Sequence, residues 1–557
     1  MTRPTVYVPP MFDPDVDLDL SRNEGRTKAD ELIAKVGDTG RAVSRYPDTS
    51  GVRSRLASLH GVDMGRILVT AGGDDALNRC FLALTGPGRN AVTTYPTFEM
   101  IPRYAEQRGV DLVEVPWWSG PFPVDEVMDS ISSETDAMFL VSPNNPTGAA
   151  LTGTDLKRLA AGVPVLILDA AYLEFGDEDL TPIALALDNV LMIRTLSKAY
   201  GLAGLRVGYL LGPVALVSRV TAFGSPYPVA ALSASVAEAR LSWPESATSD
   251  FVATIRDERE TLTELLGRLG TRPFPSQANF VLTSCDDPEW LIGAARSLGV
   301  AFRRFADRPG MEQMVRISLP GDEADFQRLV TTLEAVISPE AIIFDLDGVV
   351  ADVSRSQIVA IVETARGFGV EVDTSDIEAV KAVGNSNDDW VLTRLLLGQK
   401  GIDVPIEVVT ERFETLYQGS DAGPGLKLEE RPLVDLETWN RWAQARPLAV
   451  VTGRPRADAE EFLDRFGLSD AISALVTRED APLKPDPAPI RLALERLGVS
   501  RAWMLGDTPD DLNAARAAGV VPIGVIAAGD HPVRARERLG RAARILDKTT
   551  DLEEMLP

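Results

Sequence analysis

Short apolar runs alternate along the first part of the chain with longer segments in which apolar residues recur every three or four positions. The short runs predict buried strands, and the segments between them predict amphipathic helices. This order is typical of an α/β domain whose strands lie parallel in one sheet. We expect its strands at residues 66–71, 91–94, 137–142, 165–169, 190–194 and 206–211.

The pattern changes after about residue 225. A long charged helix is predicted at about 250–267, strands near 279–282 and 314–318, and a further helix at 322–336. This mixture predicts a second, α+β subdomain.

A new strand–helix unit begins at residues 341–350, after a linker of only four residues, 337–340. So short a joint predicts a constrained arrangement of the two halves of the chain. Residues 352 to about 445 are mostly helical by pattern, and strands resume at 448–452. The second half therefore reads as an α/β domain with a helical insertion.

Composition excludes several classes of function. The 557 residues are 45% hydrophobic and 25% charged, as in ordinary globular proteins, and a net charge of −26 opposes binding to nucleic acid. No apolar run reaches the ~20 residues of a membrane helix, and no signal peptide is evident, so we expect a cytoplasmic protein. Two cysteines and two histidines argue against a disulfide framework, a zinc site and a Ser-His triad.

Polar residues of the first domain follow its predicted strands, where open α/β sheets bind ligands. Lys198 lies among small and hydroxylic residues just after a strand, a setting that suits a Schiff base with an aldehyde cofactor. Asp169 ends a buried strand and needs a cationic partner, which a protonated pyridinium supplies. Tyr172 and Asn145 can then donate to the phenolate oxygen of that cofactor.

A phosphate position is predicted beside these groups. Gly73 and Asp74 open a helix after a strand, and backbone amides at a helix N-terminus favour phosphate, although a plain turn would explain the glycines as well. Arg206 is able to pair with the same phosphate. Phe98 follows another strand and either stacks on the cofactor ring or packs in the core.

Together these segments resemble the fold-type-I aminotransferases of the aspartate aminotransferase superfamily over about residues 5–337. The matching segments are Asn145-Pro146-Thr147-Gly148, Asp169-Ala170-Ala171-Tyr172, Ser197-Lys198 and Arg206. The resemblance implies pyridoxal 5'-phosphate as cofactor and a homodimer with shared sites. It also implies a large domain with a parallel or mixed sheet (about 30–225) and a small α+β domain (about 1–29 and 226–337).

The resemblance assigns a role to each matching residue. Lys198 is the Schiff-base lysine and moves protons, Asp169 pairs with the ring nitrogen, and Arg316 grips the carboxylate of the amino acid. The residues implied to hold the cofactor phosphate are Gly73, Asp74, Thr195, Ser197 and Arg206, with Tyr46 reaching the phosphate in the other subunit.

Within the superfamily, the chain looks most like the histidinol-phosphate aminotransferases, through residues 45–48 and the short length. Residues 20–25 resemble that family's Asn-Glu-Asn segment, and this resemblance places Asn23 at the substrate. Gly25 occupies the position where the family has the last Asn. Ala170 and residues 72–75 also depart from the usual pattern. These departures leave the pyridoxal chemistry intact and the substrate open, since threonine-phosphate decarboxylases share much of the pattern.

Four segments of the second half carry groups suited to phosphoryl transfer. Asp345 and Asp347 follow an apolar strand and would repel each other without a cation such as Mg²⁺. Thr452 and Gly453 end a strand, Lys484 is one of few lysines, and residues 503–511 run from a strand into a group of acids. Attack on phosphorus needs charge neutralisation above all, and this set supplies it.

The four segments resemble the haloacid dehalogenase (HAD) superfamily across about residues 341–557. The resemblance makes Asp345 the nucleophile and Asp347 the general acid/base, as in the phosphatases. Thr452, Gly453 and Lys484 would hold the phosphoryl group, and Mg²⁺ would be bound by Asp345, the carbonyl of Asp347 and Asp507, supported by Asp511. The insertion at about 352–445 would be a helical cap, in which residues 384–388 either contact the leaving group or form an ordinary turn.

The order of the two chemistries suggests the reaction. Histidine biosynthesis moves an amino group onto imidazole-acetol phosphate and then removes the phosphate from histidinol phosphate, so we expect small phosphorylated substrates and glutamate as donor. The alternatives are a decarboxylase of a phosphorylated amino acid followed by a phosphatase, or the same two steps on another phosphorylated amino alcohol or sugar. A non-catalytic scaffold is disfavoured, because Lys198, Asp169, Asp345, Asp347 and Lys484 are all present.

Overall fold

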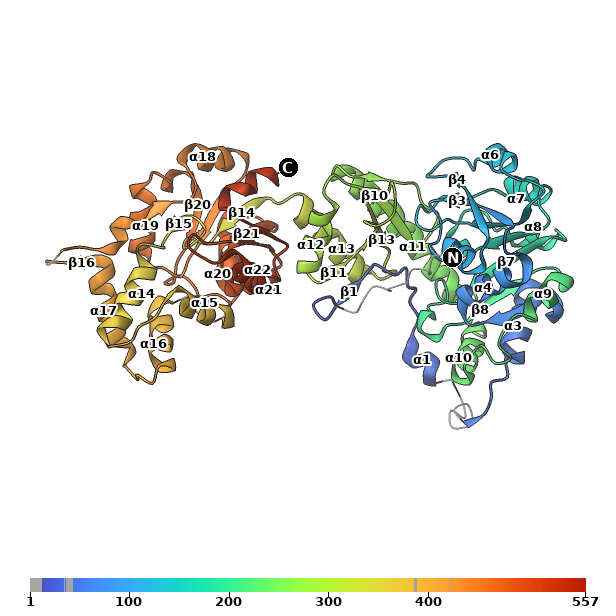
Figure 1. The fold of residues 1–557 in the computed structure, drawn as a ribbon, viewed down its shortest axis with the longest axis horizontal. Helices are drawn as coiled ribbons and strands as arrows, with labels where there is room; N and C mark the ends of the chain where they lie inside the picture. Colours follow the sequence, from blue (N-terminus) through green and yellow to red (C-terminus); the bar gives the residue numbers. More distant parts are fainter. Residues whose placement is uncertain (1–12, 35, 37–43, 385–387, 422, 557) are drawn as a thin grey trace. The chain divides into compact units, whose positions relative to one another are not determined.

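The computed structural model describes residues 13–556 except 35, 37–43, 385–387 and 422. The chain divides into two compact units (Figure 1). The first consists mainly of Asp19–Pro288 and Phe302–Arg328, and the second mainly of Leu329–Pro557 with Pro14–Leu18 and Glu289–Ala301.

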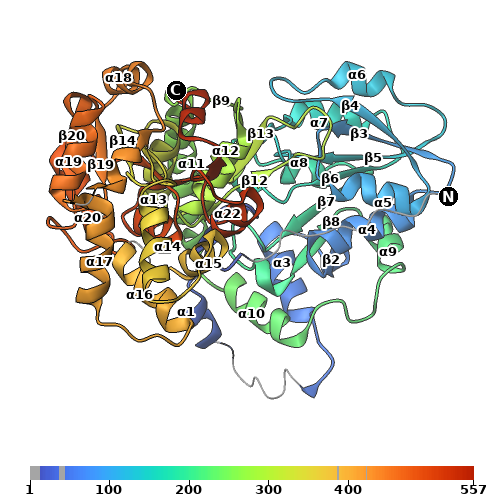
Figure 2. The same cartoon turned by 60° about the vertical axis from the view of Figure 1, so that its left-hand side comes forward.

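The first unit is built around a mixed sheet of seven strands in the order β2-β8-β7-β6-β5-β3-β4. The strands are β2 (Ile67–Thr70), β3 (Asn90–Tyr95), β4 (Asp111–Pro116), β5 (Thr135–Val141), β6 (Leu166–Asp169), β7 (Val190–Thr195) and β8 (Gly208–Leu211). Figure 2 shows β5 to β8 side by side. All six predicted strands are confirmed, together with the mixed sheet that the family resemblance implies.

The apolar pattern alone was wrong about the direction of β8, which runs antiparallel to both β2 and β7. Parallel neighbours need a crossover of a dozen or more residues, usually a helix. Only a loop with one 3-10 turn (Ala203–Leu205) joins β7 to β8, so the chain turns back. The sequence reasoning also missed β4, an edge strand that is mostly exposed and therefore lacks a continuous apolar run.

Two apolar clusters cover the two faces of this sheet. Successive strand side chains point to opposite faces, so Met138 and Leu140 join one cluster while Phe139 and Val141 join the other. Helices α3 (Ser50–His60), α7 (Gly153–Ala160) and α10 (Ala231–Leu241) contribute to the first cluster. Helices α4 (Gly72–Leu84), α5 (Met100–Arg108) and α9 (Val214–Thr221) contribute to the second.

A smaller antiparallel sheet forms the α+β part of the first unit. Its order is β12 (Arg303–Arg304), β13 (Met314–Ser318), β10 (Phe280–Ser284) and β9 (Arg272–Pro273), and the long helix α11 (Ser246–Arg268) contacts it. Arg316 pairs with Leu282 and Ser318 with Phe280 in the β10–β13 register. The two-residue spacing puts the side chains of Arg316 and Ser318 on one face of the sheet.

The second unit contains a parallel sheet of six strands with β14 at its centre. Its order is β20 (Ile472–Val476), β19 (Leu448–Val451), β14 (Ala341–Phe344), β21 (Ala502–Gly506), β22 (Val521–Val525) and β23 (Arg544–Leu546). Because β19 and β21 flank β14 in parallel register, the residues after all three strands meet at one edge.

The predicted helical insertion contains four helices with a core of their own. They are α14 (Gln357–Gly367), α15 (Thr374–Val383), α16 (Asp389–Gln399) and α17 (Ile406–Gln418). The next helix, α18 (Leu436–Ala445), packs instead on the parallel sheet, because its Trp439 and Trp442 rings lie 4.9 and 5.8 Å from the Phe344 ring of β14. The apolar residues of α18 thus pack against the sheet and not against the insertion.

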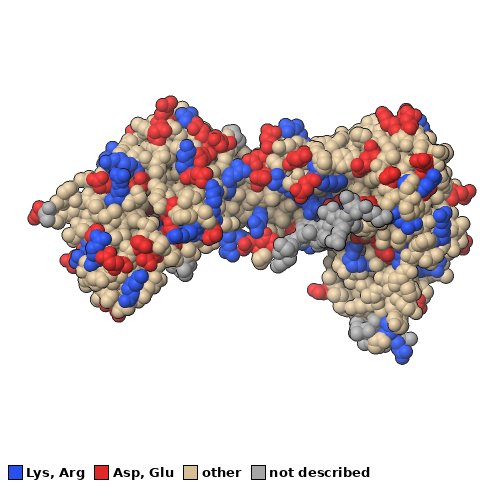
Figure 3. Space-filling view, in the orientation of Figure 1, with Lys and Arg blue, Asp and Glu red and all other residues tan. Residues whose placement is uncertain are grey.

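Acidic and basic side chains are interspersed on the face of the protein seen in Figure 3. Among the described residues, no helix is both long and apolar enough to cross a bilayer.

Candidate functional sites

The predicted pyridoxal-phosphate residues converge on one cavity at the carboxyl ends of β5, β6 and β7. The cavity measures about 130 Å³. Its lining contains every residue predicted to hold the cofactor in its own subunit: Gly73, Asp74, Phe98, Asn145, Asp169, Tyr172, Thr195, Ser197, Lys198 and Arg206. A second cavity of about 260 Å³ shares Lys198, Phe98, Asn145 and Tyr172 with the first. Lys198 therefore borders both spaces.

Asp169 is buried at the end of β6 and accepts a hydrogen bond from the backbone N–H of Ala171 at 3.1 Å. Burial raises the pKa of Asp169 to about 7, and Lys198 offsets this only in part. A protonated ring nitrogen beside Asp169 would stabilise its carboxylate, so the site fits the pyridinium of the cofactor.

Lys198 follows β7 and is partly buried. Its Nζ donates to the carbonyl of Arg22 at 3.3 Å and lies 5.7 Å from the centre of the Tyr172 ring. Burial, and then the positive charge of Arg316, lower the pKa of Lys198 to about 8. A substantial fraction of the amine is therefore neutral near pH 8, the form that reacts with an aldehyde.

A chain of hydrogen bonds joins the phenolate donors to the residue expected at the substrate carboxylate. Tyr172 Oη accepts from Asn23 Nδ2 at 3.2 Å and from Asn145 Nδ2 at 3.3 Å. Arg316 donates through Nη1 to Asn145 Oδ1 at 2.5 Å and through Nη2 to the carbonyl of Ser21 at 2.8 Å. Arg316 thus lies in the second cavity, next to the Asn145 side chain that the first cavity shares.

The predicted phosphate position lies at the N-terminus of α4. Thr195 Oγ1 donates to Ser197 Oγ at 2.9 Å, and Arg206 Nη2 pairs with Asp74 Oδ2 at 2.9 Å. Gly72 has a φ of 81°, and a Cβ there would stand 2.7 Å from Arg206 Nη2. Hydroxyls, amides and a guanidinium around a side-chain-free turn suit a phosphate dianion.

Tyr46 does not line either cavity. It is 81% exposed and stacks on Tyr227, with 4.6 Å between ring centres. Its role in another subunit remains a prediction.

The departures from the family pattern have local explanations. A Cβ on Gly25 would stand 1.7 Å from the backbone oxygen of Lys198, so only glycine fits this backbone. Ala170 is fully buried in the core, where a glutamate would need more space and a hydrogen-bonding partner. Neither substitution alters the groups that face the cavity.

Sequence reasoning missed several residues of the second cavity. Arg303 and Arg308 line it, and Arg308 Nη2 donates to the carbonyl of Thr97 at 2.9 Å. The available signal was the concentration of arginines just before the strand at 314–318.

The second predicted site lies where β14, β19 and β21 end. Lys484 Nζ bridges Asp345 Oδ1 at 2.7 Å and Asp511 Oδ1 at 2.5 Å, and donates to the carbonyl of Val451 at 3.1 Å. Oxygens of Asp345, Asp507 and Asp511 lie within 4.8 Å of one another. Three carboxylates and one lysine sum to −2, and oxygen ligands at this spacing fit a magnesium ion.

Burial dominates the electrostatics of this cluster. It raises the pKa of Asp345 well above its usual value, an effect that Lys484 opposes and Asp511 reinforces. It also raises the pKa of Asp507 to about 7. For Lys484, the two carboxylates outweigh burial and raise the pKa. A divalent cation would reduce the repulsion among the three buried carboxylates.

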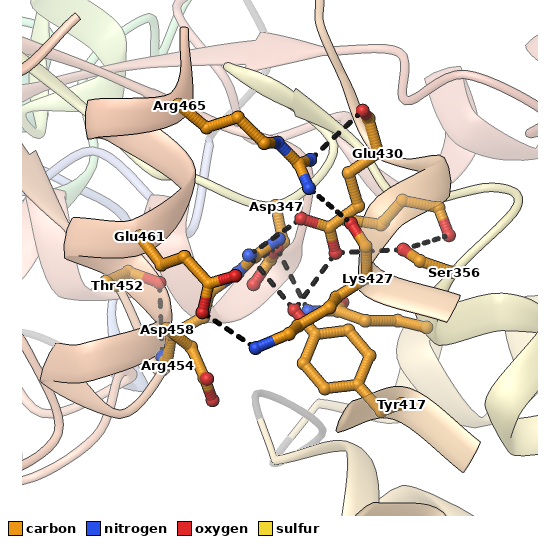
Figure 4. A network of polar contacts seen from close by, with 12 residues as sticks. Asp347, Ser356, Tyr417, Lys427, Glu430, Thr452, Arg454, Asp458, Glu461 and Arg465 are labelled. Carbon is orange, nitrogen blue, oxygen red and sulfur yellow. Dashed lines mark hydrogen bonds and ion pairs between the residues drawn. The ribbon is translucent and has the colours of Figure 1, made fainter. Parts of the chain in front are cut away.

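The side chain of Asp347 lies outside this cluster of three carboxylates. Its Oδ1 accepts from Arg454 Nε at 2.8 Å and from Gln357 Nε2 at 3.1 Å. Figure 4 shows Arg454 between Asp347 and Glu430, with Thr452 next to it. Thr452 Oγ1 accepts from the N–H of Arg454 at 3.1 Å. The acid/base role of Asp347 and the binding of metal by its backbone carbonyl both remain predictions.

A cavity of about 70 Å³ lies over these groups and is lined by both the sheet edge and the insertion. It includes the predicted Asp345, Asp347, Gly453 and Asp507. The insertion contributes residues that sequence reasoning did not single out, among them Lys381, Asp389, Trp390, Glu414 and Tyr417. Of the predicted segment 384–388, Asp388 lines the cavity, and residues 385–387 lie outside the described residues.

Comparison with known proteins identifies both domains. Residues 17–333, more than half of the chain, match the family described as aminotransferase class I and II, and residues 339–519 match the haloacid dehalogenase-like hydrolases. A histidinol-phosphate aminotransferase of Xanthomonas euvesicatoria pv. vesicatoria is 35% identical over 319 residues, 54% of this chain and 87% of that protein. An imidazoleglycerol-phosphate dehydratase of Phytophthora nicotianae is 44% identical over 195 residues, 34% of this chain and 43% of that protein.

Among solved structures, the histidinol-phosphate aminotransferase of Sinorhizobium meliloti in complex with pyridoxal-5'-phosphate shares the fold. The TM-score is 0.53 at 23% identity, over 58% of this chain and 91% of that one. The chain therefore belongs to the class I and II aminotransferases, with a pyridoxal-phosphate-dependent fold, and carries a haloacid dehalogenase-like hydrolase domain after it.

Proposed function

We propose that the chain is a bifunctional enzyme of histidine biosynthesis. Residues 1–337 would transfer the amino group of glutamate to imidazole-acetol phosphate, and residues 341–557 would hydrolyse the resulting L-histidinol phosphate to histidinol. The observation that carries the proposal is the presence in one chain of two candidate sites, a cavity that fits pyridoxal phosphate and a carboxylate cluster that fits a magnesium-dependent phosphatase. The similarity to histidinol-phosphate aminotransferases supports the choice of substrate.

In the first site, bound pyridoxal phosphate supplies an electron sink for bond changes at the amino-bearing carbon. Arg316 binds the carboxylate of glutamate in the second cavity. Nζ of Lys198, which borders both cavities, takes the proton from the substrate carbon and returns it. Asp169 would hold the ring nitrogen, and Asn145 and Tyr172 would orient the ring oxygen.

In the second site, an oxygen of Asp345 bonds to phosphorus while the bond to the leaving-group oxygen breaks. The leaving oxygen keeps the electron pair and takes the proton from the carboxyl group of Asp347. Asp347 then takes a proton from water, whose oxygen attacks phosphorus, releases phosphate and restores Asp345. Lys484 and Thr452 would hold the phosphoryl oxygens, and Asp345 and Asp507 would bind Mg²⁺.

The charges around the small cavity favour a leaving group that is an amino alcohol. Asp389, Glu414 and Asp458 line it on the side of the insertion and α19 (Arg456–Arg465). Glu414 accepts from the indole N–H of Trp390 at 3.0 Å, and Asp458 accepts from the amide of Gln418 at 2.9 Å, both neutral donors. A substrate with an ammonium group would be attracted to these carboxylates.

We further propose a homodimer formed through the aminotransferase domain. The exposed pair Tyr46 and Tyr227 is suited to an interface, and the resemblance places Tyr46 at the cofactor phosphate of the partner. Light scattering should give twice the chain mass. Mixing Lys198→Ala and Tyr46→Phe chains, each impaired by itself, should restore some aminotransferase activity if sites are shared.

The decisive experiment incubates the purified chain with imidazole-acetol phosphate and glutamate. We expect 2-oxoglutarate, histidinol and inorganic phosphate. Asp345→Asn should accumulate histidinol phosphate, and Lys198→Ala should form no amine but still hydrolyse added histidinol phosphate. Carbon dioxide release from a phosphorylated amino acid without a 2-oxo acid would favour the decarboxylase alternative. Turnover only of another phosphorylated amine would refute the histidine assignment.

A further inference from the structure

Arg454 occupies an unusual position in the hydrolase domain. It is 4% exposed and follows the phosphate-holding pair Thr452 and Gly453 at the end of β19. Its guanidinium contacts two carboxylates: Nε and Nη2 donate to Asp347 Oδ1, and Nη1 donates to Glu430 Oε2 at 3.0 Å. Arginine presents several donors in one rigid plane, so it is able to fix the orientation of both acids.

Glu430 connects this arginine to the helical insertion. It is 1% exposed, and its Oε1 accepts from Ser356 Oγ at 2.9 Å and Tyr417 Oη at 3.0 Å. Tyr417 Oη also accepts from Arg454 Nη1 at 3.1 Å. Ser356 precedes α14 and Tyr417 lies on α17, so both ends of the network reach the insertion (Figure 4).

The contacts on Asp347 are asymmetric. Arg454 and Gln357 both donate to Oδ1. A carboxyl group carries its proton on one oxygen, and an oxygen that accepts from a guanidinium is the poorer place for it. Neither of these two residues donates to Oδ2, so Oδ2 is the oxygen left to face the leaving group.

We propose that Arg454 is the positioning residue of the phosphatase reaction. It fixes the Asp347 side chain so that Oδ2 delivers the proton to the leaving-group oxygen as the bond from that oxygen to phosphorus breaks. Glu430 and Tyr417 hold Arg454 in turn, which makes this alignment depend on the packing of the insertion. The inference rests on the proposed acid/base role of Asp347.

The test compares two phosphate esters at saturating Mg²⁺. p-Nitrophenyl phosphate has a leaving group that departs without a proton, whereas ethanolamine phosphate needs one. In Arg454→Lys, we expect kcat/KM for ethanolamine phosphate to fall about 10–100-fold, while kcat/KM for p-nitrophenyl phosphate stays within about threefold. The ratio kcat/KM is the right measure, because it covers only the steps up to departure of the leaving group and not the later attack of water, which Asp347 also assists for both esters. Asp347→Asn should show the same selectivity with a larger loss.

Arg465→Lys is the matched control. Arg465 donates to the backbone carbonyls of Glu430 at 3.2 Å and Lys427 at 3.1 Å, and not to the side chains of Asp347 or Glu430, so the ratio of the two rates should stay at the wild-type value. Glu430→Gln is the second variant, because it loosens Arg454 without touching Asp347. We expect it to reduce the ethanolamine phosphate rate selectively, by about 3–10-fold.

Equal losses on both esters in Arg454→Lys and Glu430→Gln would overturn the positioning role and leave a structural one. If Arg454→Lys does not fold, the ratio of the rates on the two esters in Glu430→Gln tests the positioning role instead. If Asp347→Asn itself shows no selectivity, the acid/base assignment fails, which is a different outcome from a failure of Arg454 alone.

Discussion

Replacing Lys484 by methionine removes the only cation that pairs directly, among the described residues, with the carboxylates of Asp345 and Asp511. The lysine side chain is 3% exposed, and methionine retains most of its volume. The net charge of the cluster formed with Asp507 then changes from −2 to −3. Wild-type and variant differ mainly in electrostatics, so their comparison tests the proposed metal site.

The expected magnitude follows from burial. Breaking a buried ion pair from one side costs about 3–5 kcal/mol. In EDTA, at a pH where the carboxylates are charged, we expect the hydrolase domain of Lys484→Met to lose this much stability. A ligand at 100 times its Kd adds about 2.7 kcal/mol, and a more negative cluster attracts Mg²⁺ more strongly. The deficit should therefore shrink when Mg²⁺ is present.

Hydrogen exchange resolved by mass spectrometry is the suitable assay, because global unfolding of a chain with two domains is not a two-state process. The exchange of peptides that cover β14 and β21 gives the free energy of local opening in EDTA and in Mg²⁺. Lys400→Met is the control, since Lys400 is 45% exposed and lies 3.6 Å from Asp376. It should change stability by less than about 0.5 kcal/mol.

Two results would refute the reasoning. A loss below about 1 kcal/mol in EDTA would mean that Lys484 does not compensate the buried acids. A loss that Mg²⁺ leaves unchanged would mean that these carboxylates do not form the metal site.

Three further predictions concern the first unit. Asp169→Asn should lower the rate of the half-reaction with glutamate by about 100-fold or more while phosphatase activity persists, and a loss under threefold would contradict the pyridinium contact. Gly25→Ala places a Cβ 1.7 Å from the Lys198 backbone oxygen, so we expect weaker cofactor binding, measured by visible absorbance, and a stability loss of about 2 kcal/mol or more; a normal spectrum and Tm would contradict it. Burial, and next the charge of Arg194, lower the pKa of His60 to about 4 from the ordinary 6.5, so the stability that its neutral form contributes is present above pH 6.5 and is lost as pH falls toward 4. The free energy of local opening of the peptides around His60, measured by hydrogen exchange, should fall more steeply over that interval in wild type than in His60→Gln, by about 2–3 kcal/mol, and parallel curves would rule the effect out.

Much of the architecture was predictable because its determinants are local. Buried strands such as β6 and β14 are continuous apolar runs, and the chemically active Asp169 and Asp345 come at or just after their ends. An edge strand in which exposed polar residues interrupt the apolar ones, such as β4, lacks that signal. The direction of a strand has no local signal in the sequence either, because it depends on how the connection crosses the sheet, as β8 shows.

The sequence by itself therefore determined the two α/β domains and the residue types at the strand ends, since both follow from short-range patterns. Only the tertiary structure decided which groups meet. Arg454 contacts Asp347, which lies 107 positions away in the chain, and Glu430, which lies 24 positions away. The insertion places Glu414 and Tyr417 in the lining of the same cavity. Such contacts depend on how the segments after strands and the helices of the insertion pack together, and a polar residue shows nothing in the sequence of what it will face. Gly25 likewise looked like a departure from a motif until the close approach of the Lys198 backbone supplied its steric reason.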